Sequence, residues 1–240
     1  MSIAASLNTL RGMRDAIRDA IVGKGGSLPP GSPMGSYAQA ITNLPSSGGG
    51  GDTEIPFRSR LTVPDDTDPW HLTSLTATQV SNYAFYADTL LTTVSLPAAT
   101  SIGTYAFYGC SALTTVSLPA ATSIGNYAFQ NCPALTTADF PLVTSISTYA
   151  FQSCTSLTTA DFPLVTSISA YAFRSCSALT SLTLSKNKVA TLSGTNALLN
   201  TPIATGTGHI YVPDNLVDQY KTATNWNTYA NQILPISQKP

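Results

Sequence analysis

The sequence predicts an α/β repeat solenoid, in which a parallel sheet gains one short strand per coil, plus a small helical N-terminal segment. The first observation is a Tyr-Ala-Phe phrase that occurs five times at a step of 22 residues. The second is a set of aliphatic ladders with the same step, one of which comprises Leu91, Leu113, Leu135, Leu157 and Leu179. A strict period in the twenties is typical of solenoids, whose coils stack on one another.

Composition narrows the function classes. Of the 240 residues, 43% are hydrophobic but only 10% are charged, and the net charge is -1. This balance gives no electrostatic footprint for DNA or RNA, so we expect no nucleic-acid partner. No run of 18 apolar residues occurs, so no membrane span is predicted. The first residues lack the basic start and apolar core of a secretory signal, and we therefore expect no export by the usual route.

Residues 1–45 are predicted to form a helical anchor, followed by a Gly/Ser linker at 46–54. Apolar residues recur at helical spacing in a first helix and in a second, shorter one. They are Leu7, Leu10, Met13, Ile17, Ile21, Tyr37, Ile41 and Leu44. Such helices are marginal alone, so they either pack on each other or the solenoid, or join a larger assembly. We favour the assembly because helices in fixed contact with the solenoid would not need a flexible glycine-rich linker. The apolar stripe suggests a homo-oligomer, and our hypothesis is a trimer.

Residues 55–79 are predicted to cap the N-terminal end of the stack. Apolar and polar residues alternate roughly over 55–63, which indicates one or two strands, and residues 64–69 are typical of a turn. Trp70 to Leu72 would then plug the first coil. A cap is expected because a terminal coil otherwise exposes an apolar face and an open strand edge.

Each repeat within 80–185 contains a strand of the form Leu91-x-x-Val94-x-Leu96, with these three side chains pointing inward. Pro97 ends the strand because proline cannot donate to the next rung. The later Ile102 is expected to bring the chain back inside at a turn. The Tyr-Ala-Phe phrase would then start a short helix or 3₁₀ turn. Its phenylalanine fills the core, and burial contributes about 2 to 3 kcal/mol per coil.

The stretch from Ile102 to Pro119, with its Tyr-Ala-Phe and Leu-x-x-Val-x-Leu units, resembles the BspA-like (Treponema-type) leucine-rich repeats. The resemblance covers about residues 78–185. Residues 209–226 resemble the C-terminal end of such domains, so 186–240 is expected to be the C-terminal cap. It would hold a strand, a helix capped by Asp214, a closing Trp226 and a last strand. Such repeats are found in surface proteins, and the resemblance implies adhesion.

Residues 10–44 resemble a segment of bacteriophage structural proteins, through Ala16 to Ile21, Lys24-Gly25 and Tyr37 to Ile41. The resemblance implies attachment to other virion proteins. Our main expectation is a virion surface protein, a fibre or decoration, whose solenoid adheres to a bacterial or host surface. The alternative is a cellular adhesin or protein-interaction module at the bacterial cell surface.

The outward strand positions are the candidate receptor site, for a glycan or a protein, and the plainer interpretation is a solubilising surface. They are Thr93, Ser95, Thr115, Ser117, Thr137, Asp139, Thr159, Asp161, Ser181 and Thr183. The five repeat tyrosines form a second grid on another side, for which part-buried packing is expected. A row of like groups can gain affinity by multivalency.

Catalytic and metal-binding patterns are weak. Asp139 and Asp161 occupy one position on neighbouring strands, as a retaining glycosidase pair or a cation site would, but two solvated acids are favoured because no walled cleft is evident. Cys110, Cys132, Cys154 and Cys176 keep the 22-residue step and read as buried small side chains, not as metal ligands or disulfides. His71 and His209 lie in opposite caps. We therefore predict no enzyme, metal or cofactor.

Overall fold

A computed structural model describes residues 54–55, 71–73 and 77–240 of the chain. These residues belong to one compact unit. The predicted anchor at 1–45, with its apolar stripe, and nearly all of the linker lie outside the described residues. The same holds for most of the predicted N-terminal cap.

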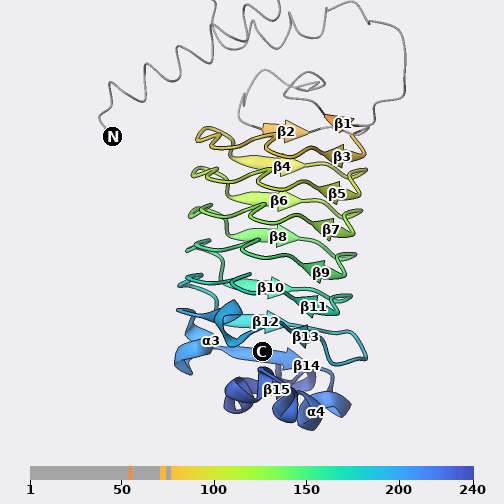
Figure 1. The fold of residues 1–240 in the computed structure, drawn as a ribbon, viewed down its shortest axis with the longest axis vertical. Helices are drawn as coiled ribbons and strands as arrows, with labels where there is room; N and C mark the ends of the chain where they lie inside the picture. The colour runs from red at the N-terminus through yellow and green to blue at the C-terminus, as the bar shows by residue number, and fades with distance from the viewer. Residues whose placement is uncertain (1–53, 56–70, 74–76) are drawn as a thin grey trace, which may run out of the picture. The chain divides into compact units, whose positions relative to one another are not determined.

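The chain winds as a stack of coils, and each regular coil adds one short strand to each of two faces (Figure 1). One face is a seven-stranded parallel sheet of two-residue strands in the order β1-β3-β5-β7-β9-β11-β13. The strands are β1 (Glu54–Ile55), β3 (Gln79–Val80), β5 (Ser101–Ile102), β7 (Ser123–Ile124), β9 (Ser145–Ile146), β11 (Ser167–Ile168) and β13 (Thr191–Leu192). From β3 to β11 the paired residues are 22 apart, as in Ile102 and Ile124.

The other face carries the longer strands and divides into two four-stranded sheets, again with parallel pairing. The first sheet comprises β2 (His71–Thr73), β4 (Thr93–Ser95), β6 (Thr115–Ser117) and β8 (Thr137–Asp139). The second comprises β10 (Thr159–Asp161), β12 (Ser181–Thr183), β14 (His209–Val212) and β15 (Ile233–Pro235). The strand β2 pairs in register with β4, so His71 to Thr73 continue this face. Trp70, the first residue of the predicted plug, lies outside the described residues.

The core confirms the predicted inward pattern. Leu91, Val94 and Leu96 are buried, and so are their counterparts in the following coils, except Ala138 in β8, which is half-buried. The five repeat phenylalanines stack directly over one another, with neighbouring ring centroids 5.1 to 5.4 Å apart and ring planes within 8° of parallel. The solenoid is therefore built around a continuous aromatic spine, as the 22-residue period predicts.

Two local predictions were wrong. Ile102 does not lie in a simple turn, because it belongs to β5 and thus to a second sheet. The Tyr-Ala-Phe phrase, predicted to start a short helix or 3₁₀ turn, forms consecutive i→i+3 turns, as in Tyr108 N to Tyr105 O at 3.2 Å, so the helix was wrong. Tyr105 N donates to Asn126 O at 3.0 Å and Phe107 N donates to Ala128 O at 2.8 Å. Since every second amide pairs with the next coil, the segment lacks the uninterrupted local bonds of a helix.

Threonine hydroxyls join successive coils by hydrogen bonds to backbone carbonyls. Thr100 Oγ1 donates to Thr78 O at 3.1 Å, and Thr114 Oγ1 donates to Thr92 O at 3.0 Å. The same bond recurs one coil later at Thr122 and Thr136. These hydroxyls satisfy backbone carbonyls that would otherwise lack a second partner. The repeats are thus rich in threonine and poor in charge partly because threonine joins successive coils.

The cysteine ladder is buried, as predicted, and also hydrogen-bonded, which the sequence did not indicate. Cys132 Sγ lies 3.1 Å from Phe107 O, and Cys176 Sγ lies 3.0 Å from Phe151 O. All four thiols are free and buried. Burial raises the pKa of Cys176 to about 12 and holds the pKa of Cys154 well above its usual value.

We therefore expect the thiols to be unreactive in the folded protein and stability to fall at alkaline pH. A thiol whose pKa is raised by folding stabilises the native state fully below its unfolded pKa of about 8.5, and this contribution is lost as the pH rises. At pH 8 a thiol reagent should label the four cysteines slowly in the folded protein and completely in the urea-unfolded protein. The free energy of unfolding, measured by urea titration, should be lower at pH 10 than at pH 7. Fast native labelling would contradict the buried ladder.

The C-terminal end is sealed by short helices and strands that follow the last regular coil. The 3₁₀ helices are η1 (Thr195–Leu198), η2 (Asp214–Leu216), η3 (Trp226–Gln232) and η4 (Ile236–Gln238), and the α-helices are α3 (Pro202–Thr205) and α4 (Val217–Thr222). Trp226 Nε1 donates to Ala190 O at 2.6 Å, and Ala190 N donates to the Tyr220 hydroxyl at 2.9 Å. The predicted Asp214 cap was wrong, because its carboxylate instead accepts from Ser237 N.

Candidate functional site

The strand face is the surface formed by the outward side chains of β4, β6, β8, β10 and β12. The outward residues of β8 and β10 are exposed, and Thr93, Ser95, Thr115, Ser117 and Ser181 are half-buried. Thr183 is an exception: it was predicted to be exposed but is 3% exposed. Its hydroxyl accepts from Lys239 Nζ at 2.9 Å, and this contact comes from 56 residues further along the chain. Receptor binding by the strand face stays a prediction.

Asp139 and Asp161 lie at matching positions on β8 and β10, and both are exposed. Lys239 Nζ lies 3.5 Å from the Asp161 carboxylate, so a cation of the chain's own C-terminal segment already sits there. The Asp161 side chain is 59% exposed, and such surface pairs contribute little to stability. Phe140 and Phe162, which follow the two acids, point inward as predicted. Among the described residues, no group of three or more metal-ligating side chains gathers.

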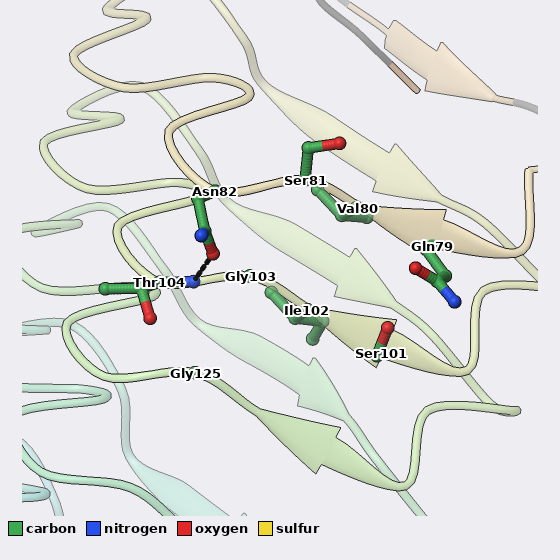
Figure 2. A pocket seen from close by; sticks show the side chains of 9 residues that line it. All are labelled: Gln79, Val80, Ser81, Asn82, Ser101, Ile102, Gly103, Thr104 and Gly125. Carbon is green, nitrogen blue, oxygen red and sulfur yellow. Dashed lines mark hydrogen bonds between the residues drawn. The ribbon is translucent and has the colours of Figure 1, made fainter. Parts of the chain in front are cut away.

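A shallow polar groove runs across the ends of β3, β5 and β7 (Figure 2). Its volume is about 300 Å³, and its lining includes Gln79, Asn82, Ser101 and Thr104. Thr104 N donates to Asn82 Oδ1 at 2.7 Å, which fixes the amide and leaves its nitrogen as a donor. A Cβ at Gly103 would lie 2.5 Å from Asn82 N, so glycine allows the two coils to approach here.

The repeat tyrosines form a stacked column along one edge of the solenoid. Successive ring centroids from Tyr83 to Tyr171 are 4.5 to 5.0 Å apart. Tyr83 is 54% exposed, and the other four are half-buried, as expected for the second grid. The pKa of Tyr105 is raised by partial desolvation and by the neighbouring phenols of Tyr127 and Tyr83. The column thus carries a row of closely spaced hydroxyls.

A second column stands three residues after the first and was missed in the sequence. It comprises Tyr86, Tyr108, Gln130, Gln152 and Arg174. The rings of Tyr86 and Tyr108 stack at 4.9 Å, Gln130 Nε2 donates to Gln152 Oε1 at 3.0 Å, and Arg174 lies over the Tyr171 ring. We call both columns together the tyrosine edge. The 22-residue step could have indicated the second column, but the residue type at this position changes from coil to coil, so no repeated residue marks it.

The backbone of the tyrosine edge is unusual. All five repeat tyrosines have φ between 58° and 60°, in the left-handed region. The second left-handed position of each coil, four residues later, carries a small or short polar residue. These are Ala87, Gly109, Asn131, Ser153 and Ser175. The left-handed conformation costs a residue with a side chain about 1 to 2 kcal/mol, so a bulky tyrosine is retained at a position that would favour glycine or asparagine.

Comparison with known proteins settles the family. The sequence profile of the BspA type leucine rich repeat region matches residues 78–202 in six copies, just over half of the chain. The chain belongs to the BspA-type leucine-rich repeat family. The match begins after the predicted anchor, so the phage resemblance of residues 10–44 stays untested. A search of curated proteins found no match.

The chain matches three solved leucine-rich repeat proteins over part of its length, and the likeness in fold rests on the first of them. A protein from Bacteroides ovatus is 24% identical with a TM-score of 0.55, over 69% of this chain and 41% of that one. The leucine-rich repeat protein of T. pallidum is 34% identical with a TM-score of 0.44, over 48% and 56%. A leucine-rich cell surface protein from Faecalibacterium prausnitzii is 22% identical with a TM-score of 0.45, over 68% and 44%. The BspA-type chain thus spans about half the length of these proteins.

Proposed function

We propose that this BspA-type chain is a non-enzymatic interaction module of the surface-adhesin kind, which contacts a glycan or protein receptor through the outside of its solenoid. One observation carries the proposal. The interior of every regular coil is filled by stacked phenylalanine and aliphatic side chains that are almost fully buried, whereas polar and aromatic groups recur in register on the outside. Repeated groups on a rigid scaffold suit multivalent contact with an extended surface.

The absence of catalysis is part of the proposal. The candidate pair Asp139 and Asp161 lies on an open face, and Lys239 contacts one of the two carboxylates. A glycosidase also needs one carboxyl group with a raised pKa in an enclosed site. We expect the wild-type chain and the variant Asp139→Asn/Asp161→Asn to be equally inactive on chromogenic glycosides. Turnover that disappears in the variant would replace the adhesin proposal with an enzyme.

Adhesion itself is tested by binding. The full chain, labelled with a fluorophore, should bind saturably to at least one surface in a panel of bacterial cells, epithelial cells, mucin and immobilised matrix proteins. Heat-unfolded protein labelled in the same way is the control for non-specific attachment. Binding that is absent on every surface, or equal for folded and unfolded chains, would count against an interaction module.

Virion attachment and trimer formation remain predictions based on residues 1–45, which lie outside the described residues. No described helix is long and apolar enough to cross a membrane. Size-exclusion chromatography with light scattering on the full chain tests the oligomer. A monomer at micromolar concentration would remove the oligomeric anchor and leave the cellular adhesin as the simpler interpretation.

A further inference from the structure

We propose that the N-terminal end of the tyrosine edge, formed by Tyr83, Tyr86, Tyr105 and Tyr108 with the adjoining polar groove, binds a neutral glycan chain. This proposal rests on the proposed adhesive function and names its site and ligand class. It moves the principal contact away from the strand face, which the sequence favours, to a different side of the solenoid.

The first argument is the distribution of exposed apolar side chains. Among residues 77–240, five large hydrophobic residues are exposed, and three of them lie in one coil. They are Tyr83 at 54%, Tyr86 at 48% and Leu90 at 39% exposure. Exposed aromatic groups that cluster in this way mark interaction sites more often than single exposed residues do.

The second argument is that the four rings are held rigidly. Tyr83 stacks on Tyr105 at 5.0 Å, and Tyr86 stacks on Tyr108 at 4.9 Å. The two pairs also meet at an angle, since the centroids of Tyr86 and Tyr105 lie 6.3 Å apart with their planes 63° apart. Rings fixed in this way lose little conformational entropy when a ligand arrives. The cluster is therefore prepared for binding before contact.

The third argument is the backbone conformation of the tyrosines. A residue in the left-handed region is disfavoured, and such strain is retained most often where the side chain has a function. At the second left-handed position of the same coils the chain uses small or short polar residues. The contrast indicates that the ring at the first position does something that alanine, asparagine or glycine would not do.

The fourth argument concerns the ligand's chemistry. In both columns Arg174 is the first charged residue, and it lies at the far end of the tyrosine edge. The one charged residue of the first coil, Asp88, is half-buried, and its carboxylate accepts from the backbone amides of Leu90 and Leu91. The groove is lined by amides and hydroxyls, and two of its residues, Asn82 and Thr104, directly precede Tyr83 and Tyr105 in the chain. Uncharged donors and acceptors next to aromatic surface suit a neutral, hydroxyl-rich ligand. A glycan chain would also meet a similar pair of rings in each of the first two coils, which favours it over a folded protein of fixed shape.

The test uses the full chain on an array of immobilised neutral, sialylated and sulfated oligosaccharides, followed by calorimetry with a neutral hexasaccharide that binds. The variant Tyr83→Ala/Tyr86→Ala should keep its backbone, because Ala87 already occupies φ 53° in the same coil. We expect it to lose at least about tenfold in affinity, as removal of two aromatic anchors should cause. The matched control Tyr149→Ala removes a half-buried ring of the same column that lies two coils beyond Tyr105, outside the proposed site. It should change affinity less than about twofold.

The outcomes separate this inference from the general proposal. Neutral-glycan binding that the double variant loses supports both. Binding to cells or matrix proteins without any neutral-glycan binding overturns the inference and keeps the adhesin. The inference is also overturned, and the adhesin kept, if only charged glycans bind, if the chain associates with a second copy through these rings, or if the double variant binds normally. No binding to any surface overturns both.

Discussion

Replacing Phe129 with alanine is expected to lower the free energy of unfolding by about 3 to 5 kcal/mol. The Phe129 side chain is completely buried in the middle of the spine. Its ring lies 5.1 Å from Phe107 and 5.3 Å from Phe151, and Phe140 packs against it at 5.5 Å. The substitution removes the hydrophobic transfer energy of the ring and leaves a cavity bounded by three other aromatic rings, which cannot easily close.

Because Phe129 lies in a central coil, its loss should affect neighbouring coils as well as its own. Each coil of a solenoid is stabilised mainly by its two neighbours, so a hole in a central coil weakens the coupling between the halves of the stack. Urea unfolding followed by circular dichroism measures the change, and a reduced slope would indicate that the halves unfold separately. Leu142→Ala, at a side chain that is 43% exposed, is the control and should cost less than about 0.5 kcal/mol. A loss below about 1 kcal/mol for Phe129→Ala would mean that the spine does not hold the stack.

The spine was predictable because its signal is redundant. Several ladders keep one 22-residue step, and a side chain that recurs in lockstep in a solenoid must occupy the same place in each coil. The alternation of Val94 with Thr93 and Ser95 also sets inside and outside on the strand. The family profile and the parallel register of the strands confirm this part of the interpretation.

The second sheet was not predictable in the same way. Its strands are two residues long, as in Ser101–Ile102, so they contain too few positions for alternation to be visible. Their existence depends on pairing with the next coil and not on local sequence. The Tyr-Ala-Phe turns were misread for a similar reason, because their alternate amides bond between coils.

The last coils depart from the period, which limits prediction at the C-terminal end. Ile168 pairs with Leu192 and Leu182 pairs with Ile210, so the 22-residue step no longer applies. Thr183 is buried because Lys239, 56 residues further along the chain, contacts it, and no local sequence pattern indicates this contact. The tyrosine edge lies between these cases: its first column follows from the period, but the left-handed backbone that fixes its direction does not.

Replacing Trp226 with alanine is expected to cost about 3 to 5 kcal/mol, comparable to the central phenylalanine, although it lies at the end of the stack. The indole is 1% exposed, meets the Tyr220 ring edge-on at 5.4 Å, and donates to the Ala190 carbonyl at 2.6 Å. The variant therefore loses burial and also leaves a buried carbonyl without its donor. Trp226→Phe keeps most of the burial and should cost about 1 to 3 kcal/mol, which isolates the hydrogen bond.

Hydrogen exchange shows whether the cap acts on the whole stack. A terminal coil has one neighbouring coil, and the cap supplies the contacts that a second neighbour would provide. If Trp226→Ala reduces amide protection in β11 and β13 most and in β5 and β7 least, the loss of the cap propagates coil by coil from the C-terminal end. If protection falls equally in all coils, the solenoid unfolds as one cooperative unit and the cap stabilises every coil alike. Protection that changes in neither region would show that the coils close the end of the core without Trp226.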